Sequence, residues 1–69
     1  MSVKVREEYL KILKERIDYA LGDCQGAPNE IVIPMLLNVL DTAQKEFHLN
    51  GLERMEACKY ITEMYGYNF

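Results

Sequence analysis

The chain has 69 residues, of which 49% are apolar and 28% are charged, and its formal net charge is −3. This size fits one small domain, residues 1–69, and the apolar content excludes a disordered chain. The charge is mildly acidic and Lys and Arg do not cluster, which argues against binding to nucleic acid, and no apolar stretch reaches the roughly 20 residues needed to cross a membrane.

The N-terminal sequence MSVKVREE lacks the apolar segment of a secretory signal peptide. We therefore expect a cytoplasmic protein in which Cys24 and Cys58 remain free thiols. Cys58 falls on an apolar helix face and should be a small core residue, whereas Cys24 lies between loop glycines and should be exposed. Cys24, Cys58 and the single histidine, His48, are scattered and form none of the closely spaced pairs of a zinc site, so the spacing predicts no metal site, and we expect no cofactor.

Two breaks rich in glycine, proline or asparagine divide the chain and predict an all-α fold of three helices. The breaks are Gly22 to Pro28 and Asn50-Gly51. The predicted helices run from Val3 to Leu21, from Asn29 or Pro34 to His48, and from Gly51 to Tyr65. The first two should form an antiparallel hairpin, to which the third helix adds.

The first predicted helix has an apolar arc of roughly 200°, which is more than one neighbouring helix usually covers. Ser2 can cap its start and Gly22 can end it. The surplus predicts self-association through this arc. Its members are Val5, Tyr9, Leu10, Ile12, Leu13, Ile17, Tyr19, Ala20 and Leu21.

The second predicted helix contains Pro34 on its polar side. If the helix starts at Asn29, Pro34 bends it; if it starts at Pro34, the proline occupies the first turn, where it is favoured. The sequence Ala27-Pro28-Asn29 is typical of a helix start, which favours the bent helix. His48 should cap its C-terminal end. Ile31 and Met35 project outside both its apolar and its polar face.

In the third predicted helix, Asn50 and Glu53 form the pattern of a capping box, and Gly66 suits a left-handed C-terminal cap on which Tyr67 folds back. Glu53 projects to the solvent side together with Glu56 and Glu63. These acidic side chains argue against a DNA-reading helix, because phosphates would repel them.

The basic residues divide by type: all five lysines project onto polar arcs, whereas Arg6, Arg16 and Arg54 project into apolar ones. Arginine suits partly buried ion pairs and interfaces, because its planar fork binds carboxylates two at a time. Two interpretations remain open. The arginines either snorkel or form ion pairs within the chain, or at least one, with Arg16 as the best candidate, contacts another molecule.

The sequence lacks the residues of a catalytic site, since Ser2 is its only serine and His48 its only histidine. We therefore expect no enzyme but a small regulatory or inhibitory protein that binds another protein and forms a homodimer, of a kind often encoded by phages. A structural assembly subunit is the alternative. The predicted interface residues are Arg6, Tyr9, Ile12, Arg16, Tyr19, Ile31, Met35, Arg54 and Phe69.

The segment from Leu13 to Phe47 resembles the small helical-hairpin phosphatases that act on response regulators of the sporulation phosphorelay. Their motif is Ser-Gln-Glu-Leu-Asp, and the corresponding stretch here is Leu37-Asn38-Val39-Leu40-Asp41, in which Leu40 and Asp41 match. The polar residues of the motif are missing, so the resemblance implies a phosphorelay-type regulator as a further alternative, and no activity is transferred from it.

Overall fold

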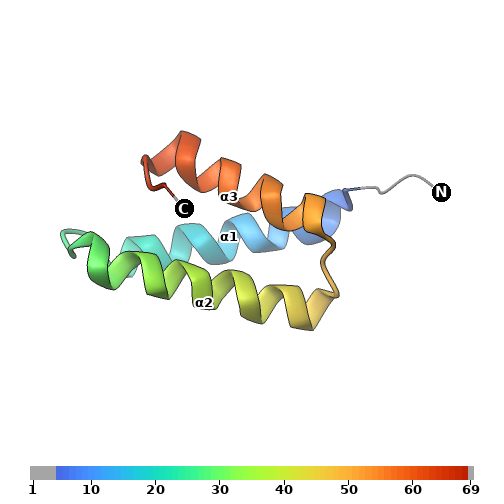
Figure 1. Ribbon diagram of the computed structural model, residues 1–69, viewed down its shortest axis with the longest axis horizontal. Coiled ribbons are helices and arrows are strands. Elements are labelled where there is room, and N and C mark those ends of the chain that lie inside the picture. Colours follow the sequence, from blue (N-terminus) through green and yellow to red (C-terminus); the bar gives the residue numbers. More distant parts are fainter. Residues whose placement is uncertain (1–4, 69) are drawn as a thin grey trace.

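The computed structural model describes residues 5–68, which form three helices and contain no strand (Figure 1). The helices are α1 (Glu7–Asp23), α2 (Asn29–Phe47) and α3 (Gly51–Tyr65). α1 and α2 form an antiparallel hairpin, and α3 runs antiparallel to α2 and so roughly parallel to α1. The predicted three-helix, all-α fold is confirmed. No helix within residues 5–68 is both long enough and apolar enough to cross a bilayer.

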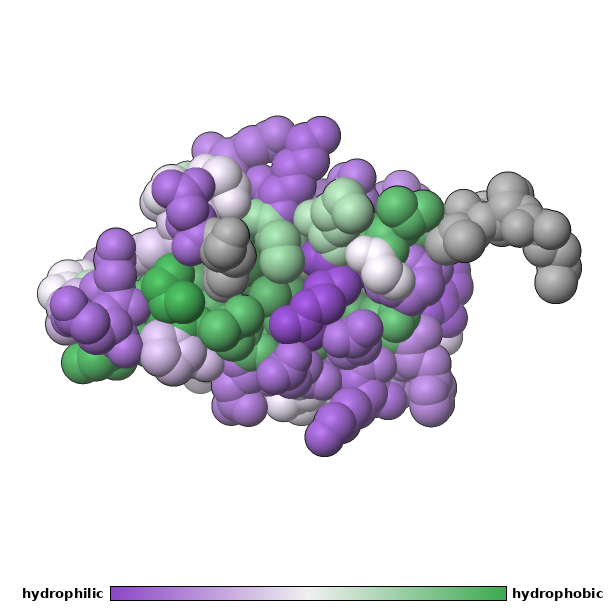
Figure 2. Space-filling view, in the orientation of Figure 1, coloured by the Kyte–Doolittle hydropathy of each residue, from purple (hydrophilic) through white to green (hydrophobic). Residues whose placement is uncertain are grey.

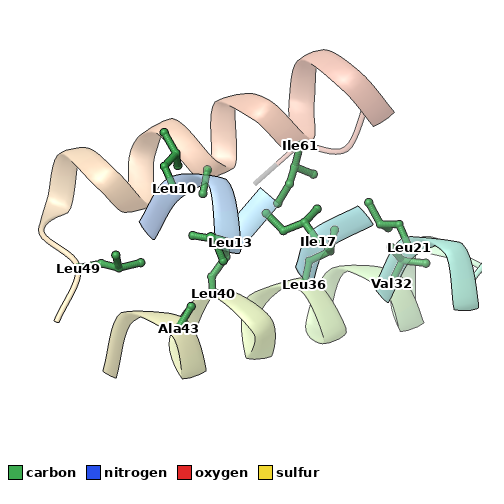
Figure 3. Packing of buried hydrophobic residues seen from close by; sticks show 11 residues of the cluster. Leu10, Leu13, Ile17, Leu21, Val32, Leu36, Leu40, Ala43, Leu49 and Ile61 are labelled. Atoms are coloured by element: carbon green, nitrogen blue, oxygen red, sulfur yellow. The ribbon is translucent and has the colours of Figure 1, made fainter. Parts of the chain in front are cut away.

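All three helices and the α2–α3 loop contribute to one apolar core (Figure 3). α1 packs against both other helices, and the contact between α2 and α3 is the smallest. These two neighbours account for most of the wide apolar arc of α1, of which Ile12 and Tyr19 remain exposed. The buried side chains are Leu10, Leu13, Ile17 and Leu21 of α1, Val32, Leu36, Leu40 and Ala43 of α2, Leu49, and Ala57 and Ile61 of α3.

The predicted bounds of α1 are wrong at both ends. The helix begins at Glu7 rather than Val3, because Arg6 is extended (φ −90°, ψ 102°) and its backbone N–H donates to Glu53 Oε2 at 2.9 Å. The predicted cap, Ser2, lies outside the described residues. At the other end the helix passes through Gly22 to Asp23, and it is Gly26 that adopts the left-handed conformation of the turn, at φ 83°.

α2 starts at Asn29, which confirms the earlier of the two predicted starts, with Pro28 as its N-cap. The helix continues through Pro34, whose side is exposed as predicted, so water can reach the carbonyl of Glu30 that the proline leaves without a helical donor. The bend at Pro34 stays a prediction. His48 caps the C-terminal end in the left-handed conformation (φ 53°), and its N–H donates to the Gln44 carbonyl.

α3 has the predicted bounds because both of its ends are set by local chemistry. Asn50 Oδ1 accepts the Glu53 N–H and Glu53 Oε1 accepts the Asn50 N–H, each at 2.9 Å, which completes the capping box. Gly66 is left-handed at φ 79°, and Tyr67 folds back against the core. The prediction that Glu53 faces solvent is wrong: its side chain is 1% exposed.

Candidate protein-binding groove

An open groove of about 560 Å³ runs between α1 and α2. All of its lining residues belong to these two helices. On α1, the face toward α3 is a different one, as shown by Asp18, whose carboxylate accepts hydrogen bonds from Tyr60 and Tyr65 of α3. The groove residues are Ile12, Glu15, Arg16, Tyr19, Ala20, Asn38, Val39 and Thr42.

Three predicted interface residues, Ile12, Arg16 and Tyr19, meet at this groove. Tyr19 is 77% exposed and Ile12 is 38% exposed, so the α1 wall presents an aromatic and an aliphatic side chain to solvent. On α2, positions 31, 35, 38 and 42 follow helical spacing and share one stripe. Ile31 (58% exposed) and the half-buried Met35 therefore continue the α2 wall toward the α1–α2 loop.

Arg16 is fixed at the groove by contacts with α2. Its Nη1 and Nη2 donate to the two carboxylate oxygens of Glu46 at 2.8 and 3.1 Å, and its guanidinium carbon lies 4.9 Å from the centre of the Phe47 ring. The hydrogen bonds from Arg16 lower the pKa of the Glu46 carboxyl. The ion pair is partly exposed, so it orients the guanidinium more than it stabilises the fold.

Arg6 and Tyr9, two other predicted interface residues, are occupied inside the molecule. Arg6 donates from Nε to Glu53 Oε2 at 2.8 Å and from Nη2 to Glu53 Oε1 at 2.7 Å and to the His48 carbonyl at 2.9 Å. The guanidinium also lies 4.7 Å from the Tyr9 ring centre, and Tyr9 packs on Phe47 at 5.1 Å. These contacts join the start of α1 to the end of α2 and the start of α3.

Arg54, near the start of α3, links this helix to α2. Apolar surface gathers in the seam between α2 and α3 toward the C-terminal end of α3 (Figure 2). Arg54 Nη1 lies 2.8 Å from Asp41 Oδ1 and 2.8 Å from Gln44 Oε1. All three arginines thus form ion pairs within the chain, as one of the two interpretations expected. In the stretch that resembles the phosphatase motif, Leu40 is buried and Asp41 is held in this ion pair.

The cysteines are free, but the prediction for Cys24 needs correction. Cys24 is half-buried rather than exposed, because it packs beside α2, where its Sγ lies 3.9 Å from Met35 Sδ. Cys58 is half-buried beside the core, and burial raises the pKa of its thiol. The last predicted interface residue, Phe69, lies outside the described residues.

The sequence did not indicate the α2 side of the groove or its ion pair. Asn38 and Thr42 are ordinary polar residues, and Val39 belongs to an apolar face, so their part in the groove depends on how α2 is rotated against α1. Glu46 is 30 residues from Arg16, and only the register of the hairpin brings them together. The single signal available was the position of Arg16 on an apolar arc.

Over residues 5–68, no three side chains among His, Cys, Asp and Glu are close enough together to hold a metal ion. Comparisons of the chain with protein-family models, with curated proteins and with solved structures find no match.

Proposed function

We propose that this protein is a small regulatory or inhibitory protein, without enzymatic activity, that binds another protein through the α1–α2 groove. The observation that carries the proposal is Tyr19, a large aromatic side chain that is 77% exposed at the edge of a concave surface. Tyrosine and arginine are among the residues most enriched at the energetic centre of protein interfaces, and here Arg16 and Tyr19 line the same groove.

The groove is built for an ordered contact. Tyrosine loses little side-chain entropy on binding because it has only two rotatable side-chain bonds. Arg16 is held in place by Glu46 and Phe47, so it loses little further side-chain entropy when a partner binds. A groove between two helices matches the width of a third, and the target segment is therefore an amphipathic helix that places apolar side chains against Ile12 and Val39.

The proposal is tested by affinity capture with the tagged protein from cells of its native host. The wild type is compared with Tyr19→Ala and with Met64→Ala, which removes a similarly exposed apolar side chain from α3, away from the groove. We expect one captured protein to be retained by the wild type and by Met64→Ala and to fall about tenfold with Tyr19→Ala. Equal capture by all three, or no specific capture, contradicts the proposal.

Arg16→Ala and Lys14→Ala form a second matched pair. Both remove a basic side chain from α1, but Lys14 lies on the α3 side, 5.1 Å from the Tyr60 ring centre. We expect Arg16→Ala to weaken target binding by more than about 1 kcal/mol and Lys14→Ala to leave it unchanged. Titration calorimetry with the captured target measures the difference, and equal effects would remove Arg16 from the binding surface.

A further inference from the structure

The exposed stripe of α1 beside the groove is symmetric in its chemistry. Ile12 and Tyr19 are both exposed, and along the sequence they are equally far from the midpoint between residues 15 and 16. At that point Glu15 and Arg16 carry opposite charges side by side. A stripe with this order is complementary to a reversed copy of itself.

We propose that the groove of the free protein is occupied by a second copy of this chain, with the two α1 helices antiparallel and a two-fold axis between Glu15 and Arg16. This inference rests on the proposed function, because it uses the same groove. In such a pair the numbers of facing residues add up to 31. Ile12 then faces Tyr19 of the second copy, and Glu15 faces Arg16 of the second copy, each contact occurring twice.

The charges favour this arrangement over the parallel one. Within the described residues Glu15 forms no ion pair, and Arg16 uses two of its five N–H groups on Glu46, so the remaining donors can reach a second carboxylate. In a parallel pair Glu15 would face Glu15 and Arg16 would face Arg16. Like charges at the centre of an interface exclude that orientation.

The packing is also reciprocal. Tyr19 of one copy enters the groove of the other beside Ile12 and Val39, while its own groove receives the second Tyr19. A stable dimer buries about 800 Å² on each partner, which is about one sixth of the 4802 Å² surface of this molecule. The α1 stripe must therefore be joined by Ile31 and Met35 of α2, and we expect a dissociation constant in the micromolar range, on the order of 10 μM.

Because one surface serves both contacts, dimerisation and target binding exclude each other. The dimer covers Tyr19 and Arg16 and predominates where the protein concentration exceeds the dissociation constant, and a target with a tighter-binding helix converts it into a one-to-one complex. Because the second copy competes for the groove, dimerisation raises the target concentration that is needed for half-maximal target binding.

Charge reversal tests the arrangement, with sedimentation velocity as the readout of mass. Glu15→Arg places two arginines at each central contact and Arg16→Glu places two glutamates there, so each variant alone should dimerise at least tenfold more weakly than the wild type. Mixed together, they restore opposite charges at both contacts and should form a heterodimer at least tenfold tighter than either homodimer. Glu63→Arg, on the outer side of α3, is the control and should dimerise as the wild type does.

Circular dichroism verifies that Arg16→Glu, which also loses its pairing with Glu46, still folds. A wild type that stays monomeric at high micromolar concentration, or a dimer that neither charge reversal weakens, overturns the inference. The proposed function fails separately. A monomer with groove-dependent capture of a target leaves that function standing, whereas a charge-sensitive dimer without any captured target supports the second copy alone and indicates an assembly subunit.

Discussion

Glu53 connects three parts of the fold through hydrogen bonds of one side chain. Its buried carboxylate accepts hydrogen bonds from the backbone N–H groups of Arg6 and Asn50 and from the Arg6 guanidinium. A carboxylate can be buried at this low exposure only because its oxygens are satisfied by donors. One side chain therefore caps α3, fixes the start of α1 and connects both to the end of α2 through Arg6.

Replacing Glu53 with Gln should lower the free energy of unfolding by about 2 kcal/mol, because the Glu53 carboxylate is buried whereas the Arg6 side chain is 35% exposed. The substitution leaves Arg6 without its charged partner, and it replaces one of the two buried acceptor oxygens with an amide that cannot accept a hydrogen bond. Glu63→Gln is the control on the same helix, because Glu63 forms only an exposed pair with Lys59 and should change stability by less than about 0.5 kcal/mol. Urea unfolding followed by circular dichroism measures both, and equal effects would show that the buried pair is dispensable.

The same carboxyl predicts how stability depends on pH. The hydrogen bond from Arg6 is the main cause that lowers the pKa of Glu53 from 4.5 to about 2. Because the folded pKa is the lower one, the stabilisation is complete above pH 4.5 and is lost as the pH falls toward 2. Unfolding free energies measured from pH 6 to 2 should drop more steeply for the wild type than for Glu53→Gln. Parallel curves would assign the acid sensitivity to other groups.

At the end of α1, two glycines that are four residues apart differ in backbone conformation. Gly22 lies inside α1 with open space around it, whereas Gly26 is left-handed at φ 83°. Gly22→Ala should raise the free energy of unfolding by roughly 0.5–1 kcal/mol through helix propensity, and Gly26→Ala should lower it by about 1 kcal/mol through backbone strain. Thermal unfolding distinguishes them. A loss of stability in both variants would place the helix end at Gly22, as the sequence predicts.

His48 offers the complementary test at the end of α2. It is the one non-glycine residue with positive φ among residues 5–68, at 53°, and a side chain there costs free energy that glycine avoids. Its carbonyl accepts from Arg6, and this bond does not need the imidazole. His48→Gly should therefore stabilise the protein by about 0.5–1 kcal/mol in chemical denaturation. A loss of stability would instead assign the imidazole a contact of its own.

The helices also show which features a sequence can reveal. α3 was predicted with its correct bounds because Asn50, Glu53 and Gly66 act within a few residues of one another. The start of α1 was predicted incorrectly, because Arg6 is held extended by Glu53, which is 47 residues away in the sequence. The same holds for the groove. Its α1 wall could be predicted from the width of one apolar arc, whereas its α2 wall depends on how the two helices pack and could not be predicted from the sequence.

In the molecule as a whole, α1 is the central helix, and polar contacts attach α3 to it at both ends. At one end Arg6 donates to Glu53, and at the other the hydroxyl groups of Tyr60 and Tyr65 donate hydrogen bonds to Asp18 Oδ1 at 2.7 and 2.6 Å. Between these ends, Ala57 and Ile61 provide the buried side chains of α3. The attachment of α3 thus depends on a carboxyl group that titrates in acid, Glu53, and on a phenol that titrates in alkali, Tyr60.

The contact of Asp18 with the two tyrosines should make the protein sensitive to alkali. The hydrogen bond to Asp18 is the main cause that raises the pKa of Tyr60 to about 12, and it also raises the pKa of Tyr65. Since the folded pKa is the higher one, this stabilisation is complete below pH 10 and is lost as the pH rises to 12. Ultraviolet titration of the phenols should show two late ionisations in the wild type that move toward pH 10 in Asp18→Asn. Glu56→Gln, an exposed carboxylate on the outer side of α3, should leave both ionisations in place, and an unchanged titration in Asp18→Asn would show that the contact does not hold α3 to α1.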